Sequence, residues 1–450
     1  MNAPFPHGAV EAAFHDLAAA IAGAATAGET WTAGYSAEVS DFVRFNRGRV
    51  RQPGTVVQRY LDLDLVHGAK HATARLALAG DPAADRAAVT GAMATARAAR
   101  DDLGDDPHLL FPDTVVDSRD VRGGPLPPAE AIVDSVLGAA PGLDLVGFYA
   151  GGTVYRGFAN AMGQRNWHEA TSCNLQWSLY DRADKAVKSG LSGFTFDERA
   201  FAAKMDEARE ALAHVAKPSR RLEPGAYRAY LAPAAVEEIV SLLCWGGFSG
   251  RALATRQSSL TRMHGADGVG LDPRVCITEA TVDGVAPRFQ AEGFARPPRV
   301  PLIEAGRLAG SLVAPRTARE FSLEANGANA WETPEALAMA GGDLPAADAL
   351  AALGTGLYVG NLWYLNYSDR PACRFTGMTR FATFWVEDGR IVAPIDVLRF
   401  DDTLWRVLGT KLEALTRETE LILSTDTYRE RSLASMRLPG LLLSELAFTL

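Results

Sequence analysis

The first hundred residues combine two amphipathic helices with long alternating segments. Apolar residues recur at helical spacing between positions 10 and 21, which predicts a helix that covers a sheet. Residues 31–45, 50–66 and 69–78 alternate apolar and polar positions, and this pattern predicts antiparallel strands. A second helix is predicted over residues 85–103, with one apolar face turned inward.

A second unit repeats this combination of helix and strands. The pattern predicts a helix at 128–139, strands at 143–150, 153–160 and 167–181, and a closing helix at 197–217. No convincing internal sequence repeat accompanies the shared arrangement.

The C-terminal half has a different pattern. A short strand at 226–231 and a helix at 234–245 are followed by many short strands and turns, with a further helix predicted at 402–415. Frequent short strands with turn residues between them favour a curled antiparallel domain. The predicted fold class is therefore α+β, with N-terminal antiparallel sheets packed with helices and a β-rich, barrel-like C-terminal domain.

Four segments follow from these patterns. Residues 1–103 form a predicted N-terminal α+β domain, and residues 104–127, which hold several prolines and Gly123-Gly124, form a linker. Residues 128–224 form a central α+β domain. Residues 225–450 form the β-rich C-terminal domain.

The stretch 356–394 carries the most specific signal. It contains two alternating runs around Phe375-Thr376-Gly377-Met378-Thr379-Arg380, and Asp388-Gly389 supplies a strong hairpin turn. This order resembles the C-terminal signature of the TldD/PmbA (TldE) family of peptidase-related proteins. The segments Val154–Gly163, Phe248–Ala252 and Leu302–Leu308 follow the order of that family as well. The resemblance covers roughly residues 31–410.

The family that the chain resembles has two kinds of member. TldD-type proteins carry a zinc site on a helical His-Glu-x-x-x-His motif with a later cysteine, whereas TldE/PmbA-type proteins lack the site and pair with a TldD. Together they form a shell around an internal chamber, where unfolded peptides are cut at the TldD zinc. Such complexes are linked to the maturation of peptide antibiotics and to the removal of a gyrase-directed antitoxin.

The chain lacks histidines where a zinc site of this kind would need them. A catalytic zinc takes about three protein ligands, usually imidazole or thiolate, and keeps a position open for water. The corresponding helix falls in 233–245, which has no histidine, and the whole of 226–450 has one, His264. The family's Asp-Asp-Glu-Gly element reads Gln290-Ala291-Glu292-Gly293 here, and its later Gly-Asn element is replaced at 326–330. These departures point to a divergent TldE branch.

His168-Glu169 begins like a metallopeptidase motif but lies in an alternating segment. The family spacing would require a histidine where Cys173 stands. Because residues five apart on a strand point to opposite faces, His168 and Cys173 are not expected to share a metal.

The other cysteines also show no metal-ligand spacing. Cys244 and Cys276 lie in apolar runs and are interpreted as small core residues. Cys373 lies in a loop, and it is the only one of the four cysteines whose position allows exposure to solvent. Four scattered cysteines suit reduced thiols in a cytoplasm.

Two charged pairs leave alternatives open. Glu237 and Glu238 fit either a remnant acidic pair near the place of the first TldD ligand or the first turn of a helix, where carboxylates complement the dipole. Arg374 and Arg380 fit either a peptide-binding groove or solvated strand positions, and the latter is favoured.

The composition of the chain argues against nucleic-acid and membrane partners. A net charge of −9 argues against binding along a nucleic-acid backbone, which requires clustered cations. No apolar run of about 18 residues predicts a membrane span, and Met1–Gly8 does not have the pattern of a secretory signal. We therefore expect a cytoplasmic protein without nucleic-acid or membrane partners.

The sequence thus predicts a non-catalytic, TldE/PmbA-like subunit of a metalloprotease that acts on unfolded peptides. It has no catalytic, cofactor or metal residues of its own, and zinc is expected only in a TldD-type partner. We expect a dimer with that partner or with itself. Two alternatives remain: a divergent metallopeptidase that uses His168, Cys173 or Cys373, and a homodimeric peptide-binding protein.

Overall fold

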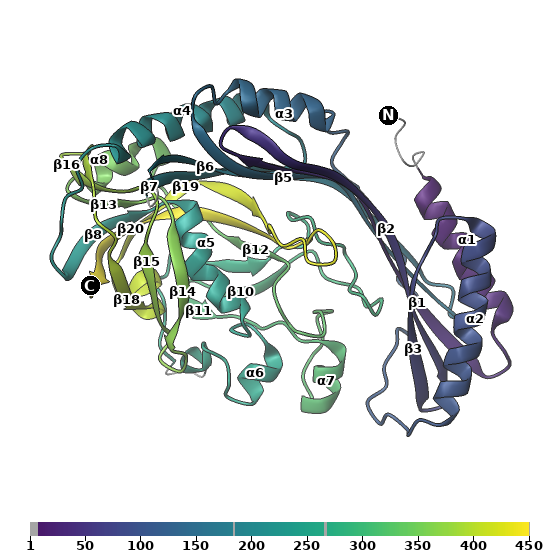
Figure 1. The fold of residues 1–450 in the computed structure, drawn as a ribbon. Helices are drawn as coiled ribbons and strands as arrows, with labels where there is room; N and C mark the ends of the chain where they lie inside the picture. Colours follow the sequence, from purple (N-terminus) through teal and green to yellow (C-terminus); the bar gives the residue numbers. More distant parts are fainter. Residues whose placement is uncertain (1–7, 183–184, 265–267, 450) are drawn as a thin grey trace.

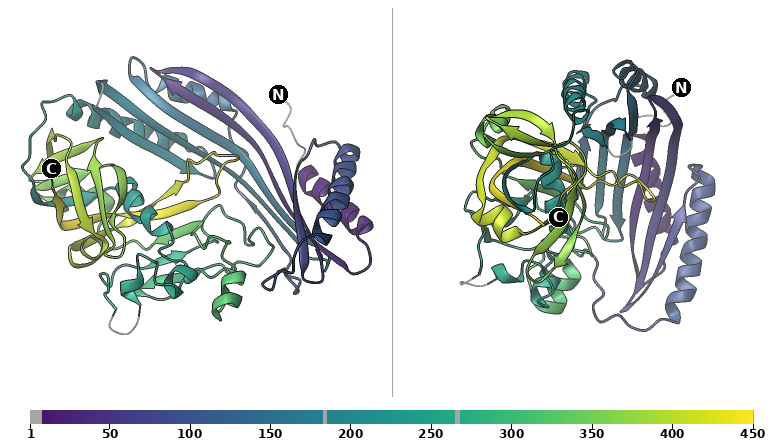
Figure 2. Two further views of the ribbon diagram at one scale, coloured as in Figure 1. Left: turned by 60° about the horizontal axis from the view of Figure 1, so that its bottom comes forward. Right: turned by 60° about the vertical axis from the view of Figure 1, so that its left-hand side comes forward.

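The computed structural model describes residues 8–182, 185–264 and 268–449. A long, curved N-terminal sheet arches over the C-terminal half, and helices lie on the outer side of the arch (Figure 1). The two further views in Figure 2 show the same arrangement. The predicted α+β class is confirmed, with antiparallel pairing in the N-terminal part and a β-rich C-terminal part.

The helices in the described residues are α1 (Ala9–Ala24), α2 (Pro82–Asp101), α3 (Ala129–Gly138), α4 (Glu198–Val215), α5 (Pro233–Ser241), α6 (Gly250–Ala254), α7 (Pro315–Phe321) and α8 (Ala349–Leu353). Each of them is too short or too polar to span a bilayer.

The N-terminal sheet has the strands β1 (Glu29–Asn46), β2 (Arg49–His67), β3 (Lys70–Ala77), β4 (Ser118–Arg122), β5 (Asp144–Asn160), β6 (Arg165–Arg182) and β7 (Lys185–Gly193). Their order is β3-β2-β1-β5-β6-β4, and β7 also pairs with β6. Strands predicted for residues 1–103 and 128–224 therefore share one sheet, because β1 pairs with β5. The predicted linker contributes β4, which pairs in parallel with β6. The domain boundaries themselves stay a prediction.

Large apolar side chains fill the outer face of this sheet. Phe14 of α1 lies against Gly157 of β5, where a Cβ atom would come within 2.7 Å of its ring. Glycine at this position therefore lets the helix approach the sheet closely. Under α4, Trp177 of β6 makes an edge-on contact with Phe201, at 5.5 Å between ring centroids. Asp197 begins α4 by accepting hydrogen bonds from two backbone N–H groups.

The opposite, concave face of the sheet is buried but polar. It carries Ser36, Glu38, Ser40, His168, Ser172 and Asn174, each less than 9% exposed. These side chains face the C-terminal half, as the contacts of His168 and Ser172 show. We call this surface the inner face.

The C-terminal strands are β8 (Gly225–Leu231), β9 (Ile277–Glu279), β10 (Val300–Glu304), β11 (Arg307–Leu308), β12 (Ala336–Met339), β13 (Gly356–Val359), β14 (Leu362–Asp369), β15 (Arg374–Thr379), β16 (Thr383–Glu387), β17 (Arg390–Pro394), β18 (Arg399–Thr403), β19 (Leu412–Leu423) and β20 (Ser435–Phe448). Their main order is β11-β10-β9-β12-β20-β8-β13-β16-β17, with β14, β15, β18 and β19 branching from it. The strands do not close into a barrel, because the order ends at β11 and β17.

The helix predicted at 402–415 is wrong. The chain continues β18 to Thr403, makes one π-helical turn at Arg406–Thr410, and enters β19 at Leu412. The local pattern around Val407 and Leu408 favours a helix, but the residues that follow form β19, which pairs along its length with β20. Tertiary pairing thus overrides a local pattern.

Candidate functional site

Helix α5 lies within residues 233–245, where the sequence analysis expected a helix without metal-binding histidines. Its buried face packs Val236, Ile239 and Val240 into the C-terminal core. Glu237 and Glu238 project from the other side and are half-buried. They lie in the second turn, so the first-turn alternative is wrong, and the helix dipole does not explain them.

Burial raises the pKa values of both carboxyl groups in this acidic pair. Desolvation raises the pKa of Glu237 to about 7, and the adjacent charge of Glu238 adds to the shift. Desolvation also raises the pKa of Glu238. Lys188 of β7 opposes both shifts, which places a cation of the N-terminal sheet near the pair. Glu237 can therefore accept or release a proton near neutral pH.

Cys244 follows α5 and offers no thiolate. Desolvation, together with the carboxylates of Glu279 and Glu237, raises its pKa to about 12. A thiol that stays protonated is a poor metal ligand, and α5 supplies no imidazole. No group of three histidine, cysteine, aspartate or glutamate side chains within residues 8–182, 185–264 and 268–449 could hold a metal ion. These residues do not fit a zinc site of the TldD type.

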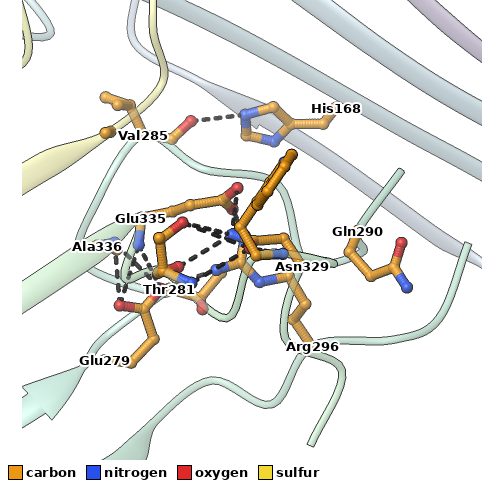
Figure 3. Close-up of polar contacts among 12 residues, drawn as sticks. His168, Glu279, Thr281, Val285, Gln290, Arg296, Asn329, Glu335 and Ala336 are labelled. Atoms are coloured by element: carbon orange, nitrogen blue, oxygen red, sulfur yellow. Dashed lines mark hydrogen bonds and ion pairs between the residues drawn. The ribbon is translucent and has the colours of Figure 1, made fainter. Parts of the chain in front are cut away.

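His168 serves as a contact between the two halves of the chain. It is 0% exposed on the inner face, and its Nε2 donates to the backbone oxygen of Val285 at 3.0 Å (Figure 3). Its Nδ1 lies 3.3 Å from Oδ2 of Asp120 on β4. The contact with His168, together with Arg122, lowers the pKa of Asp120 to about 2. The imidazole thus joins the two halves through Nε2, while its Nδ1 faces a carboxylate of the same sheet.

The strand prediction for this segment is confirmed, and His168 and Cys173 lie on opposite faces. Pairing between β5 and β6 runs without a register shift through both residues. Cys173 packs with Trp177 in the core under the helices, and burial raises its pKa to about 11. The two residues cannot share a ligand.

The remaining cysteines are structural. Cys373 is 1% exposed, so the exposure that its loop position allowed is not observed, and burial raises its pKa to about 11. Its loop folds back onto the core because the Cys373 N–H donates to the Arg370 oxygen. Cys276 is half-buried, and its Sγ accepts a hydrogen bond from the Ala305 N–H at 3.4 Å.

A buried ion cluster lies next to the inner face (Figure 3). Arg296 donates to Glu279 at 2.7 Å and also pairs with Glu335. Glu279 accepts further hydrogen bonds from the backbone N–H groups of Glu335 and Ala336. Each carboxylate thus has a cation and additional donors, which is the condition for burying such charges. The cluster fixes the loop before β12 and leaves no carboxylate free to act as a base.

The segment that replaces the family's Asp-Asp-Glu-Gly element docks on the inner face. Gly293 has a positive φ of 86° and packs against the ring of Phe158, which an added Cβ would meet at 2.2 Å. Gln164 of the N-terminal sheet donates to the Gly293 oxygen at 2.8 Å. Only glycine fits this close approach of the two halves.

Sequence reasoning missed Arg431, which links the two halves through several hydrogen bonds. It lies in the loop between β19 and β20, is 4% exposed, and donates to the Ser172 oxygen, the Ser172 Oγ and the Gly152 oxygen. Its backbone N–H donates to Glu38 at 2.9 Å. No sequence signal marks this role, because the segment Arg429-Glu430-Arg431 has the composition of a solvated turn.

The two arginines of the signature have different surroundings. Arg374 forms an exposed ion pair with Asp401 at 2.7 Å. The Arg380 guanidinium lies 4.1 Å from the ring centroid of Trp363, with no carboxylate partner among the described residues. Arg374 therefore agrees with the favoured interpretation as a solvated strand residue, whereas Arg380 stacks on an exposed aromatic ring.

Solved structures share this architecture. TldE from Thermococcus kodakarensis has a TM-score of 0.76 and 14% identity, with 97% of this chain and 100% of that chain covered. A proposed modulator of DNA gyrase from Thermotoga maritima has a TM-score of 0.70 and 13% identity over 98% and 100% of the two chains. Another from Bacteroides thetaiotaomicron has a TM-score of 0.71 and 14% identity over 99% of each chain.

Sequence comparison points to the same relatives. No curated protein matches the chain. The model of the PmbA/TldA metallopeptidase C-terminal domain matches residues 224–450, which is half of the chain. The chain therefore belongs to the PmbA/TldD family.

Proposed function

We propose that this chain is a non-catalytic, TldE-like subunit of a cytoplasmic protease that acts on unfolded peptides. The observation that carries the proposal is the composition of α5 and its surroundings. This helix presents Glu237 and Glu238 but no histidine, and Cys244 beside it is held as a thiol. A family scaffold without zinc donors suits a structural half of an enzyme whose chemistry lies in another subunit.

The contacts of the inner face favour a structural role for this chain over a catalytic one. His168 and Arg431 are engaged in contacts that join the two halves of the chain, and the carboxylates of the cluster around Arg296 are paired within the C-terminal half. Such contacts fix the curvature of the long sheet against the C-terminal half. In a complex, this chain would supply part of the wall of a chamber for unfolded peptides, and a TldD-type partner would supply the zinc.

The proposal is tested with the chain purified alone and with a TldD-type protein that carries an intact His-Glu-x-x-x-His motif. Alone, the chain should contain no stoichiometric zinc by elemental mass spectrometry and should not cleave a fluorogenic unfolded peptide. Mixed with the partner, it should form a complex in light scattering, with an interface of roughly 2,000 Å² or more in total. The same partner with its first motif histidine replaced should still bind but should not cleave.

Each alternative has its own outcome. One equivalent of zinc together with chelator-sensitive cleavage by the pure chain would identify a divergent metallopeptidase. A stable homodimer that binds peptides but ignores the TldD-type protein would identify a homodimeric peptide-binding protein. A chain that stays monomeric in both conditions would end the proposal of a structural half.

A further inference from the structure

The signature stretch places an exposed edge strand beside α5. Strand β14 pairs only with β15 in the part of the chain that the structure describes. Figure 1 shows β14 alongside β15 at the rim of the C-terminal half, with α5 behind it. Six of its eight residues are exposed or aromatic, and Tyr364 is 76% exposed. An unpaired edge of this length is a template for another strand unless it is blunted or used.

A bulge in β14 aims one aromatic side chain outward. The register moves from Trp363↔Met378 to Asn366↔Thr376, so two residues of β14 face Gly377 alone. Leu365 turns inward over Gly377, where an added Cβ would meet it at 2.7 Å. Tyr364 takes the other direction, with a positive φ of 59°.

This backbone conformation is strained for a tyrosine. Left-handed φ values favour glycine and asparagine, and an aromatic residue there is uncommon. The chain holds Tyr364 in this conformation without burying its ring, so packing does not explain the choice of residue. Strain of this kind gathers at ligand-binding positions.

Cations without carboxylate partners stand at both ends of β14. At its start, the Arg380 guanidinium covers Trp363, whose ring centroid lies 5.5 Å from that of Tyr364. Beyond its end, Arg370 donates to the Trp245 oxygen and lies 5.9 Å from the ring of Tyr367. Neither arginine has an ion pair among the described residues, although the chain carries a net charge of −9.

The acidic side chain closest in sequence does not neutralise these cations. Asp369 accepts a hydrogen bond from the Ala372 N–H at 3.0 Å, which closes the turn after β14. The strand therefore presents an aromatic centre between two uncompensated positive ends. The two guanidinium groups contact the rings of Trp363 and Tyr367, which are four residues apart in β14, or roughly 13 Å at about 3.3 Å per residue.

We propose that β14 binds an extended acidic peptide as an added strand, with peptide side chains against Trp363 and Tyr364 and peptide carboxylates at Arg380 and Arg370. This inference rests on the proposed role with unfolded peptides and names the strand and the peptide chemistry. Backbone hydrogen bonds along a strand edge give affinity that does not depend on the peptide sequence. The two cations add a requirement for acidic peptide residues at a fixed spacing. The preferred peptide carries acidic residues about four positions apart with apolar or aromatic residues between them.

The experiment uses the full chain and fluorescence anisotropy of a labelled ten-residue peptide with that spacing. Tyr364→Gly removes the ring and relieves the strain, so it should weaken binding about tenfold while thermal stability is unchanged or higher. Arg380→Gln should weaken binding of the acidic peptide several-fold, and less so at high salt. Arg390→Gln, at an exposed arginine of the β16–β17 hairpin, is the matched control and should have no effect.

Two further peptides and the oligomeric state separate the possible failures. A peptide with alternate backbone N-methyl groups should lose binding if β14 adds a strand, and a peptide with lysine in place of its acidic residues should bind weakly. If the chain binds peptides but Tyr364→Gly and Arg380→Gln leave the affinity unchanged, the assignment to β14 is overturned while the proposed function stands. If Tyr364→Gly instead shifts the oligomeric state in light scattering, β14 is a subunit interface, and the peptide assignment is also overturned. If no unfolded peptide binds to the chain alone or to its complex with a TldD-type protein, the proposed function fails as well.

Discussion

On its outer face the N-terminal sheet packs large apolar rings beneath helices, whereas on its inner face buried polar side chains meet the C-terminal half. Trp177 and Phe14 represent the outer face, and His168, Ser172 and Glu38 represent the inner one. Both faces exclude water. They differ in what each contact contributes to stability and in how closely it fixes the geometry.

The outer face mainly stabilises the fold, whereas the inner face mainly fixes how the two halves of the chain are placed. Apolar burial contributes about 25 cal/mol per Å² without preferred direction, so the outer face supplies more of the driving force for folding than the inner face does. A buried hydrogen bond adds only about 1 kcal/mol net, but a buried donor or acceptor left without its partner costs about 1–3 kcal/mol. The inner face therefore contributes little to overall stability and strongly favours one relative placement of the two halves.

The largest expected effect lies on the outer face. Trp177→Ala should lower the free energy of unfolding by about 3–5 kcal/mol, because the Trp177 ring is 2% exposed and packs against Phe201. Urea denaturation followed by circular dichroism measures the change. Trp177→Phe is the control and should cost much less, since the indole N–H has no hydrogen-bond partner in the described residues. A loss below 1 kcal/mol for Trp177→Ala would contradict this view of the outer face.

The next effect tests the inner face. Arg431→Met should cost about 3 kcal/mol, because two backbone oxygens and the Ser172 hydroxyl lose a buried charged donor. Hydrogen exchange should become faster around Gly152 and Ser172 while the core near Trp177 stays protected. Arg429→Met, two residues earlier and exposed, should change stability little. Equal effects of the two substitutions would show that the inner-face contacts of Arg431 do not hold the halves together.

A pH effect follows from α5. The pKa of Glu237 is raised from 4.5 to about 7, so the folded chain binds a proton more tightly than the unfolded chain. Stability should therefore be highest below pH 4.5 with respect to this group, and should fall as the pH rises from 4.5 through about 7. Because the side chain is only half-buried, we expect a loss of about 1–2 kcal/mol.

Glu237→Gln should remove this dependence. Melting temperatures of the two proteins between pH 5 and pH 8 give the comparison, and the variant should be the more stable one at pH 8. An identical pH profile for the chain and the variant would show that Glu237 ionises normally in the folded state.

The smallest effect on stability is expected for an ion pair that is exposed to solvent. Arg75→Ala breaks an exposed ion pair with Asp62 at 2.9 Å and a stacking contact with Tyr60. The expected loss is below about 1 kcal/mol, because both charges are solvated. A double-mutant cycle with Asp62→Ala isolates the pair, and a coupling energy above that range would mean that surface charges matter more to this sheet than its buried faces suggest.

The sequence by itself determined the regular parts of the molecule. Alternation over residues 167–181 predicts a strand, and the structure confirms it and separates His168 from Cys173. Apolar residues at helical spacing likewise predict α1 and α4, and turn residues predict the hairpins that join neighbouring strands. These features depend on local periodicity and turn chemistry, which are carried by the residues themselves.

Only the tertiary structure decided the rest. The burial of Arg431 depends on the loop between β19 and β20 reaching Gly152 and Ser172 on the inner face of the N-terminal sheet, and no local pattern encodes that contact. The same holds for the helix wrongly predicted at 402–415, where β19 gains a partner distant in the sequence. The raised pKa of Glu237 arises from burial, to which the charge of Glu238 adds, whereas Lys188 of the other half opposes the shift. Desolvation and long-range pairing act between segments that the chain brings together only on folding, so their effects cannot be seen in any stretch of the sequence alone.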